Sequence, residues 1–431
     1  MNICVIGGGG HVGLVTGACF AELNHRVICI DNDKSKIRDL NAGRIPFYEP
    51  GLAEMVKRNK RKKRLRFSTD IREAVRKSQV IFISVGTPSR EGGDADLSFV
   101  ESVSRQIAVS MPSYRLIVEK STVPVETGKW IKHTIGIFNK KGIDFDIASN
   151  PEFLREGSAV EDFMNPDRVI VGVETEKAER LLQKLYKPIK APIVVTDINS
   201  AELIKHASNS FLAMKISFIN AVSTVCERVG ADIVKVARGV GLDKRICESF
   251  FSAGLGFGGP CFPKDLAAFI RIAEKVGYDF RLLKEVQSVN EEQKRLTVQK
   301  VRQMLWNLQN KKVCILGVAF KPETDDIRSA PSLDIISMLQ KEGVAIKAYD
   351  PKAMKHAKKK TKNVEFCKDP YKAAEDCDCL VIVTEWSEFK HLDLARIKKV
   401  MRQPIIVDGR NIYSPSRIKK LGFKYQGVGV R

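Results

Sequence analysis

Short apolar runs separated by amphipathic stretches recur along the chain. Residues 2–6 and 26–30 are such runs, and residues 14–23 between them have apolar side chains at the spacing of one helix face. Further apolar runs lie at 80–85, 116–119, 146–149, 169–173 and 193–195, with helical stretches between them. Strands that alternate with helices predict a parallel, doubly wound sheet, so the N-terminal part is expected to be an α/β domain.

The turn between the first two apolar runs has the glycine spacing of a dinucleotide-binding site. The pattern G-x-G-x-x-G fits Gly8, Gly10 and Gly13, and the second run ends in Asp31. The glycines permit close approach of a pyrophosphate to the helix N-terminus, and the acid accepts hydrogen bonds from the ribose diol. We therefore predict NAD as the cofactor, rather than NADP. Gly7 is one glycine more than the usual spacing and could shift the strand register or the phosphate turn.

A long segment without proline or glycine leads to a second region of the same plan. Residues 199–229 have helical spacing and would form a helix of about 45 Å, followed by a helical stretch at 231–239. Residues 312–351 then repeat strand, loop, helix and strand, and further strands are predicted at 379–384 and 404–407. The fold class is therefore α/β, with two Rossmann-like doubly wound domains joined by a long central helix. The expected domains are 1–197, 198–300 and 301–431.

Length and composition limit the class of protein. The chain has 431 residues, of which 44% are hydrophobic, and no apolar run reaches the ~18–20 residues of a membrane span. Its N-terminus has no signal-peptide pattern. The ten cysteines include no Cys-x-x-Cys, which is typical of reduced thiols and argues against a disulfide framework or a zinc site. We predict a cytoplasmic protein that binds no metal and no membrane.

The formal net charge of +21 is high for an enzyme. Much of it lies in the runs 57–66 and 355–362, and nucleic acid is the first partner that such runs suggest. Neither run contains interleaved aromatic residues or a nucleic-acid motif. Solvated helix ends and a field that attracts small anions are the preferred explanation, so no nucleic-acid partner is predicted. An inactive polyanion-binding protein with a dehydrogenase fold is the alternative from another class.

A glycine-rich loop at residues 254–265 presents a candidate nucleophile, Cys261. Four glycines allow the backbone to approach a ligand closely, and a cation such as Lys264 favours the nucleophilic thiolate form. The other interpretation is a glycine turn with a structural cysteine, and this loop alone favours neither.

Polar residues follow several predicted strands, at the sheet edge where ligands bind in doubly wound domains. They include Thr87, the segment 120–124, and Asn150 with Pro151 and Glu152. Asn150 and Pro151 have the pattern of a helix start, in which case Glu152 would share a helix face with the residue four positions later, Glu156.

The sequence resembles the UDP-glucose/GDP-mannose dehydrogenase family over nearly its whole length, and within it the branch that acts on UDP-glucose. The motifs that carry the resemblance are HVGLVTGACFAELNHRVICID, VGTP, STVP, NPEFLREG, AELIKHASNSFLAMKISFIN, GFGGPCFPKD, GVAFKPETDDIRSAPS and DGRN. One departure is Glu126, at a position where the family commonly has glycine.

The resemblance implies a function and a set of residues. Members oxidise the C6 alcohol of UDP-glucose to UDP-glucuronate with two NAD+ through a covalent cysteine intermediate, and the long helix forms a dimer interface. The implied catalytic residues are Cys261, Lys205, Asn209, Asp265, Glu152 and Thr122. The implied NAD contacts are Gly8, Gly10, Gly13, Val12, Asp31, Lys36, Thr87, Thr122, Glu156, Lys264 and Arg328. The implied UDP-sugar contacts are Glu152, Phe153, Leu154, Arg155, Lys205, Asn209, Arg245, Phe250, Phe251, Gly258, Lys321 and Arg410, of which Arg245 would come from the neighbouring subunit. The closest alternative is the same chemistry on UDP-N-acetylmannosamine or GDP-mannose.

Overall fold

The computed structural model describes residues 1–88, 90 and 93–430 and contains two compact units. Unit 1 consists of Met1–Ser208 and Ala267–Gly277, and unit 2 consists of Asn209–Leu266 and Tyr278–Arg431.

Unit 1 contains an eight-stranded sheet in the order β3-β2-β1-β4-β5-β6-β7-β8, counted over the described residues. The order of its first six strands is that of dinucleotide-binding domains. The strands are β1 Asn2–Ile6, β2 Arg26–Ile30, β3 Leu65–Ser68, β4 Val80–Ile83, β5 Arg115–Glu119, β6 Phe145–Ser149, β7 Val169–Val173 and β8 Ile193–Thr196. The helices are α1 His11–Glu22, α2 Lys34–Asn41, α3 Leu52–Arg61, α4 Ile71–Lys77, α5 Ser98–Ser110, α6 Thr127–Phe138, α7 Ala159–Met164 and α8 Glu176–Tyr186.

Strand residues of unit 1 alternate between two separate hydrophobic cores. Ile3 and Val5 of β1 belong to one core, which also contains residues of α1, α3, α7 and α8. Cys4 and Ile6 of the same strand belong to the other, with residues of α4, α5 and α6. Because successive strand side chains point to opposite faces, helices cover both faces of the sheet, as the doubly wound prediction requires.

One strand pair departs from the parallel sheet that the sequence predicts. β7 pairs with β6 in the antiparallel sense, and β8 then runs parallel to β7. A parallel neighbour needs a crossover that returns the chain along the sheet, usually a helix. Within the described residues, the connection from β6 to β7 contains only the six-residue α7, and no longer helix runs back along the sheet between these strands.

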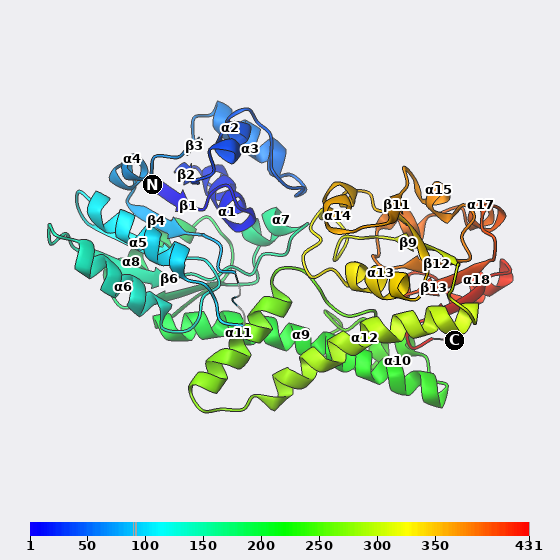
Figure 1. Cartoon of the computed structure of the whole chain (residues 1–431). Coiled ribbons are helices and arrows are strands. Elements are labelled where there is room, and N and C mark those ends of the chain that lie inside the picture. Colours follow the sequence, from blue (N-terminus) through cyan, green and yellow to red (C-terminus); the bar gives the residue numbers. More distant parts are fainter. Residues whose placement is uncertain (89, 91–92, 431) are drawn as a thin grey trace. The chain divides into compact units, whose positions relative to one another are not determined.

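The long central helix is present as predicted. α9 (Ile198–Val229) is one unbroken helix of 32 residues, drawn in green in Figure 1. It is followed by α10 Ile233–Gly241, α11 Phe262–Lys275 and α12 Arg281–Leu305.

Unit 2 repeats the strand order of a dinucleotide-binding domain without its glycine fingerprint. Its sheet has the order β11-β10-β9-β12-β13-β14 in the described residues, and every pair is parallel. The strands are β9 Lys312–Leu316, β10 Ala345–Tyr349, β11 Val364–Phe366, β12 Cys379–Ile382, β13 Ile405–Asp408 and β14 Lys424–Gly427. The helices are α13 Pro331–Lys341, α14 Met354–Lys360, α15 Pro370–Ala374, α16 Ser387–Lys390, α17 Leu394–Val400 and α18 Pro415–Lys420. The predicted fold class is thereby confirmed.

The two basic runs coincide with the ends of helices. The first includes the last turn of α3, and the second includes the last turn of α14. Cations are stabilised there by the helix dipole, in agreement with the helix-end interpretation.

Within the described ranges, no helix is both long enough and apolar enough to cross a membrane. The same ranges hold no cluster of three or more histidine, cysteine or acidic side chains placed to bind a metal ion. All ten cysteines lie in these ranges and none forms a disulfide.

Candidate active site

The additional glycine is accommodated in the turn after β1. Gly7 has a φ of +83°, and the N–H groups of Gly7 and Gly8 both donate to Ile30 O at 2.8 Å. A Cβ on Gly13 would lie 2.2 Å from Gly7 O, so only glycine fits there. Gly7 therefore lies in the turn, outside the β1–β2 pairing that runs from the pair Asn2 and Arg26 to the pair Ile6 and Ile30.

The turn fits a dinucleotide. Asp31 is buried at the end of β2, where its carboxylate accepts from the N–H groups of Gly9 at 3.1 Å and Asp33 at 3.0 Å. A Cβ on Gly10 would have only Gly7 O within 4 Å, at 3.4 Å, so this side of the turn is open at the N-terminus of α1. That helix end suits a pyrophosphate, and Asp31 suits a ribose diol. Val12 lies in the first turn of α1, and Lys36 in that of α2.

Glu152 and Lys205 form a buried ion pair in unit 1. Lys205 Nζ lies 3.1 Å from Glu152 Oε1, and the two side chains are 4% and 5% exposed. The second oxygen of Glu152 accepts from Leu154 N at 2.5 Å. Lys205 Nζ also lies 5.2 Å from the centre of the Phe153 ring. The carboxylate and the ammonium are thus fixed and largely screened from solvent.

The predicted helix start at Asn150 is wrong. No helix follows until α7, so Glu152 and Glu156 do not share a helix face. Asn150 is instead a buried hydrogen-bonding centre: Oδ1 accepts from Lys120 Nζ at 3.0 Å and from Tyr186 Oη at 2.5 Å, and Nδ2 donates to Ile170 O at 2.7 Å. These bonds satisfy an amide that could not be buried unpaired, and they outweigh its capping preference.

Lys120, the first residue of the segment 120–124, is a buried charge for which no motif implies a role. It is 4% exposed at the end of β5, and burial lowers the pKa of its amine to about 8. Glu152 raises this pKa and Lys205 lowers it further, so the three charges interact. The sequence signal that could have indicated Lys120 is its position, directly after an apolar strand and before Ser121-Thr122.

Cys261 stands at the start of a helix in unit 2. It immediately precedes α11, and its carbonyl oxygen accepts from Asp265 N at 2.8 Å, as in the first turn of a helix. The positive end of the helix dipole favours an anion such as a thiolate at this place.

Asp265 is held by two neighbours in the same unit. Asn209 Nδ2 donates to its Oδ2 at 2.6 Å, and Lys264 Nζ lies 2.9 Å from its Oδ1. The Asp265 side chain is 1% exposed. An amide, a carboxylate and an ammonium are thus joined, and the carboxylate and the ammonium lie within four residues of Cys261 in the sequence.

The glycine loop packs its backbone tightly within unit 2. A Cβ on Gly258 would lie 2.2 Å from Ser329 O, and a Cβ on Gly259 would lie 2.6 Å from the Phe320 ring. Phe250, before the loop, has a φ of +61°. Glycine is required at both loop positions by close approach.

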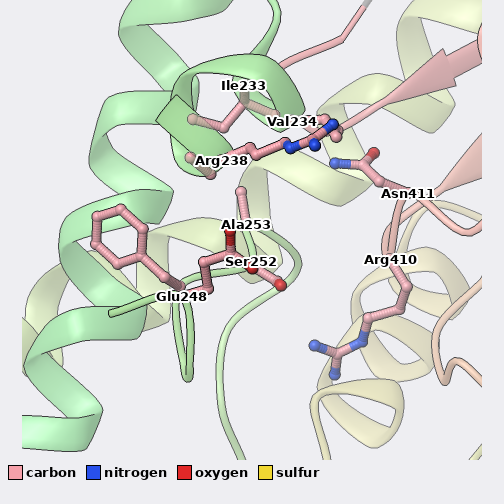
Figure 2. A pocket seen from close by; sticks show the side chains of 10 residues that line it. Ile233, Val234, Arg238, Glu248, Ser252, Ala253, Arg410 and Asn411 are labelled. Atoms are coloured by element: carbon pink, nitrogen blue, oxygen red, sulfur yellow. The ribbon is translucent and has the colours of Figure 1, made fainter. Parts of the chain in front are cut away.

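A cavity of about 340 Å³ in unit 2 adjoins the start of this loop. Figure 2 shows Arg238 extending from α10 toward Asn411, while Arg410 approaches from the strand side. Arg410 Nε donates to Val383 O at 2.8 Å and lies 3.2 Å from Glu385. The lining residues are Ile233, Val234, Ala237, Arg238, Glu248, Phe251, Ser252, Ala253, Arg410 and Asn411. Two guanidinium groups suit an anionic ligand such as a diphosphate.

Other predicted site residues take part in local contacts. Thr87 Oγ1 donates to Thr122 O at 2.8 Å in unit 1. Three arginines pair with nearby acids: Arg155 with Asp162, Arg245 with Asp243, and Arg328 with Asp326. Lys321 Nζ lies 5.8 Å from the centre of the Phe320 ring. Leu154 and Glu156 lie in the segment between β6 and α7.

The implied catalytic residues fall into two groups. Unit 1 contains Thr122, Glu152 and Lys205, and unit 2 contains Asn209, Cys261 and Asp265. Lys205 and Asn209 lie one turn apart on the unbroken α9.

Three family models match the chain. The NAD binding domain of the UDP-glucose/GDP-mannose dehydrogenase family matches residues 1–190, its central domain matches 199–292, and its UDP binding domain matches 314–415.

Relatives resemble the chain over its full length. The UDP-glucose 6-dehydrogenase TuaD of Bacillus subtilis is 47% identical over 99% of this chain and 93% of its own. A solved structure of a UDP-glucose dehydrogenase from Pyrobaculum islandicum is 39% identical, with a TM-score of 0.93 over 100% of this chain and 98% of that one. A solved UDP-D-ManNAc dehydrogenase from Pyrococcus horikoshii is 28% identical, with a TM-score of 0.88 over 100% and 99%. The chain therefore belongs to the UDP-glucose/GDP-mannose dehydrogenase family and is an NAD-dependent oxidoreductase.

Proposed function

We propose that this enzyme oxidises the C6 alcohol of UDP-glucose to UDP-glucuronate through a covalent intermediate on Cys261, using two NAD+. The observation that carries the proposal is the position of Cys261 at the N-terminus of α11, beside Asp265 with its partners Asn209 and Lys264. The names of the relatives at 39% and 47% identity support UDP-glucose as the substrate.

The nucleophile solves a chemical problem of the second oxidation. Bound NAD+ supplies the hydride acceptor for each of the two oxidations. The alcohol first loses a hydride and a proton and becomes an aldehyde. The Cys261 thiolate then adds to the aldehyde carbon, a C–S bond forms, and the oxygen gains a proton to give a thiohemiacetal. Loss of a second hydride and proton leaves a thioester, which water cleaves to release the carboxylate and restore the thiol.

Each of the other implied catalytic residues has a proposed role in these steps. Lys205 and Asn209 stabilise negative charge on the reacting oxygen, where preorganised donors are most effective. Asp265 takes part in proton transfer, and its bonds to Asn209 and Lys264 hold its carboxylate in place. Glu152, together with Thr122, acts in the water steps.

The remaining proposed contacts form two groups, one for NAD and one for the substrate. The proposed NAD contacts are Gly8, Gly10, Gly13, Val12, Asp31, Lys36, Thr87, Thr122, Glu156, Lys264 and Arg328. The proposed substrate contacts are Glu152, Phe153, Leu154, Arg155, Lys205, Asn209, Arg245, Phe250, Phe251, Gly258, Lys321 and Arg410. The regions 1–197, 198–300 and 301–431 are the proposed functional domains.

A direct assay tests the substrate. Purified protein with NAD+ should form two NADH for each UDP-glucose consumed, followed at 340 nm as an absorbance increase. UDP-N-acetylmannosamine and GDP-mannose serve as matched controls and should give little NADH. Turnover of either control in place of UDP-glucose would overturn the proposed substrate and leave the proposed chemistry in place.

The functional unit is proposed to be at least a dimer. α9 exposes Phe211, Phe218 and Val225, each 57–58% exposed and spaced seven residues apart. Apolar residues at this spacing lie on one helix face, as in helix–helix interfaces. Phe218→Glu should therefore convert the assembly to monomers in sedimentation velocity. Glu176→Gln, on the exposed face of α8, is the control that should sediment like the unchanged protein.

Complementation tests whether Arg245 acts across subunits. Arg245→Ala and Cys261→Ser should each be inactive alone. Mixing them under conditions of subunit exchange should restore about a quarter of the unchanged activity, because half of the dimers are mixed and each has one complete site. No recovery in a mixture shown to contain mixed dimers would contradict action across the interface.

A further inference from the structure

Two buried side chains of α9 hold the segment of unit 1 that carries Thr122. The Glu202 carboxylate accepts from Glu126 N at 2.7 Å and from Gly128 N at 2.8 Å. His206 Nε2 lies 2.8 Å from Val123 O. Glu202 and His206 are four residues apart on one helix face, and they are 2% and 1% exposed. The segment is thus bound to α9 on both sides of Pro124.

The backbone at the start of α6 explains why a carboxylate is needed. Glu126 caps this helix with a φ of +78° and makes no side-chain cap bond. A left-handed conformation accounts for the glycine that the family commonly has at this position. The first N–H groups of a helix lack internal partners, and Glu202 satisfies two donors at this end. A Cβ on Gly128 would lie 2.5 Å from Ile198 Cγ2, so α6 starts directly against α9.

We propose that Glu202 and His206 are positioning residues that fix Thr122 for the water-dependent steps, and that Glu202 does so in its ionised form. The inference rests on the proposed function, in which Thr122 acts together with Glu152. Neither residue needs to touch the substrate: both act through the backbone of residues 123–128.

The electrostatic surroundings make this interaction sensitive to pH near neutrality. Burial raises the pKa of Glu202 to about 7, although its two backbone hydrogen bonds lower it. Of the charges around it, Glu126 raises this pKa and Lys129 on α6 lowers it. Burial also raises the pKa of Glu119, at the end of β5, to about 8, and Glu202 contributes to that rise. A protonated carboxyl retains one good acceptor oxygen, so protonation of Glu202 weakens one of the two N–H bonds.

Activity and stability should therefore respond to pH in opposite directions. A carboxyl whose pKa rises from 4.5 to about 7 on folding contributes stability fully below pH 4.5 and loses it as the pH rises through 7. In the folded protein, the ionised form that holds Thr122 appears as the pH rises through about 7. If Glu202 had a merely structural role, kcat would not rise over the pH range in which its contribution to stability is lost.

The pH dependence of kcat tests the proposal. In the unchanged enzyme kcat should fall as the pH drops below about 7. In Glu202→Gln this limb should disappear, with kcat at pH 8 reduced by about 10-fold and KM within about 2-fold. Glu176→Gln should keep the limb. Persistence of the limb in Glu202→Gln would overturn the proposal. Loss of the limb in Glu119→Gln instead would assign the titration to Glu119.

Amide hydrogen exchange separates this inference from the proposed function. In the unchanged protein without substrate, the amides of Glu126 and Gly128 should lose protection by about 10-fold below pH 7, after correction for intrinsic rates. Protection that depends on pH, in a protein that does not turn over UDP-glucose, would support the positioning role of Glu202 and refute the proposed function. Unchanged protection would refute the positioning role of Glu202 alone.

If Glu202→Gln does not fold, His206→Phe serves instead. This variant should lower kcat and retain the limb near pH 7. An unaltered kcat would refute the role of His206.

Discussion

Replacing Cys261 by serine is expected to end sustained turnover, with kcat reduced on the order of 10³-fold or more because the nucleophile is lost. The hydroxyl of serine is a far weaker nucleophile than a thiolate at neutral pH, and the helix N-terminus that favours a thiolate cannot ionise it. Binding should persist, because the substitution exchanges one small side chain for another. Isothermal titration with UDP-glucose and NAD+ would measure binding, and NADH formation would measure turnover.

A second cysteine provides the matched control. Cys247 is exposed, and hydrogen bonds from Ser249 lower the pKa of its thiol, with a smaller contribution from Lys215. It is therefore an exposed thiol with a lowered pKa that the proposed mechanism does not use. Cys247→Ser should retain turnover. Full steady-state activity of Cys261→Ser would remove covalent catalysis from the proposed function.

Replacing Lys205 by methionine should impair both turnover and stability. Loss of a preorganised cation at the reacting oxygen is expected to lower kcat by about 10²–10³-fold. The substitution also leaves Glu152 buried without its ion-pair partner at 3.1 Å, which should destabilise the fold by about 3 kcal/mol. Urea titration measures the free energy of unfolding, and initial rates measure kcat.

A double substitution separates the two effects. In Lys205→Met with Glu152→Gln the unpaired charge is gone, so most of the lost stability should return while turnover stays low. If the double variant is as unstable as Lys205→Met alone, the pair does not account for the destabilisation. Retained kcat in Lys205→Met would instead refute the role of this lysine at the reacting oxygen.

The sequence predicts the strands of the fold wherever the strand is apolar. β1, β2 and β7 have the predicted bounds, because their residues are buried on both faces and form continuous apolar runs. β3, β11 and β14 were not predicted. Their burial alternates or is partial, as in β11 with its sequence VEF, and polar residues on the outer positions interrupt the apolar pattern.

The sequence is less informative about how the candidate site is held. The family motifs indicate Glu152, Lys205 and Cys261, because the proposed chemistry requires those residue types at those places. The partners of Asn150 come from distant strands and helices, and no local pattern reveals them. Glu202 has the same character, since a glutamate on a helix is usually a solvent-exposed residue. Residues that act through tertiary contacts are found only when those contacts are known.

The unbroken course of α9 limits how the gene can change. Each residue of an α-helix turns the chain by about 100° and advances it by about 1.5 Å. Deletion or insertion of a single residue between Lys205 and Asn209 would rotate one side chain away from the other by more than a quarter of a circle. Substitutions along the helix can be compensated one at a time, whereas a change of length cannot. Among natural variants, α9 should therefore tolerate changes of residue far better than gaps, and gaps should be confined to the loops that precede and follow it.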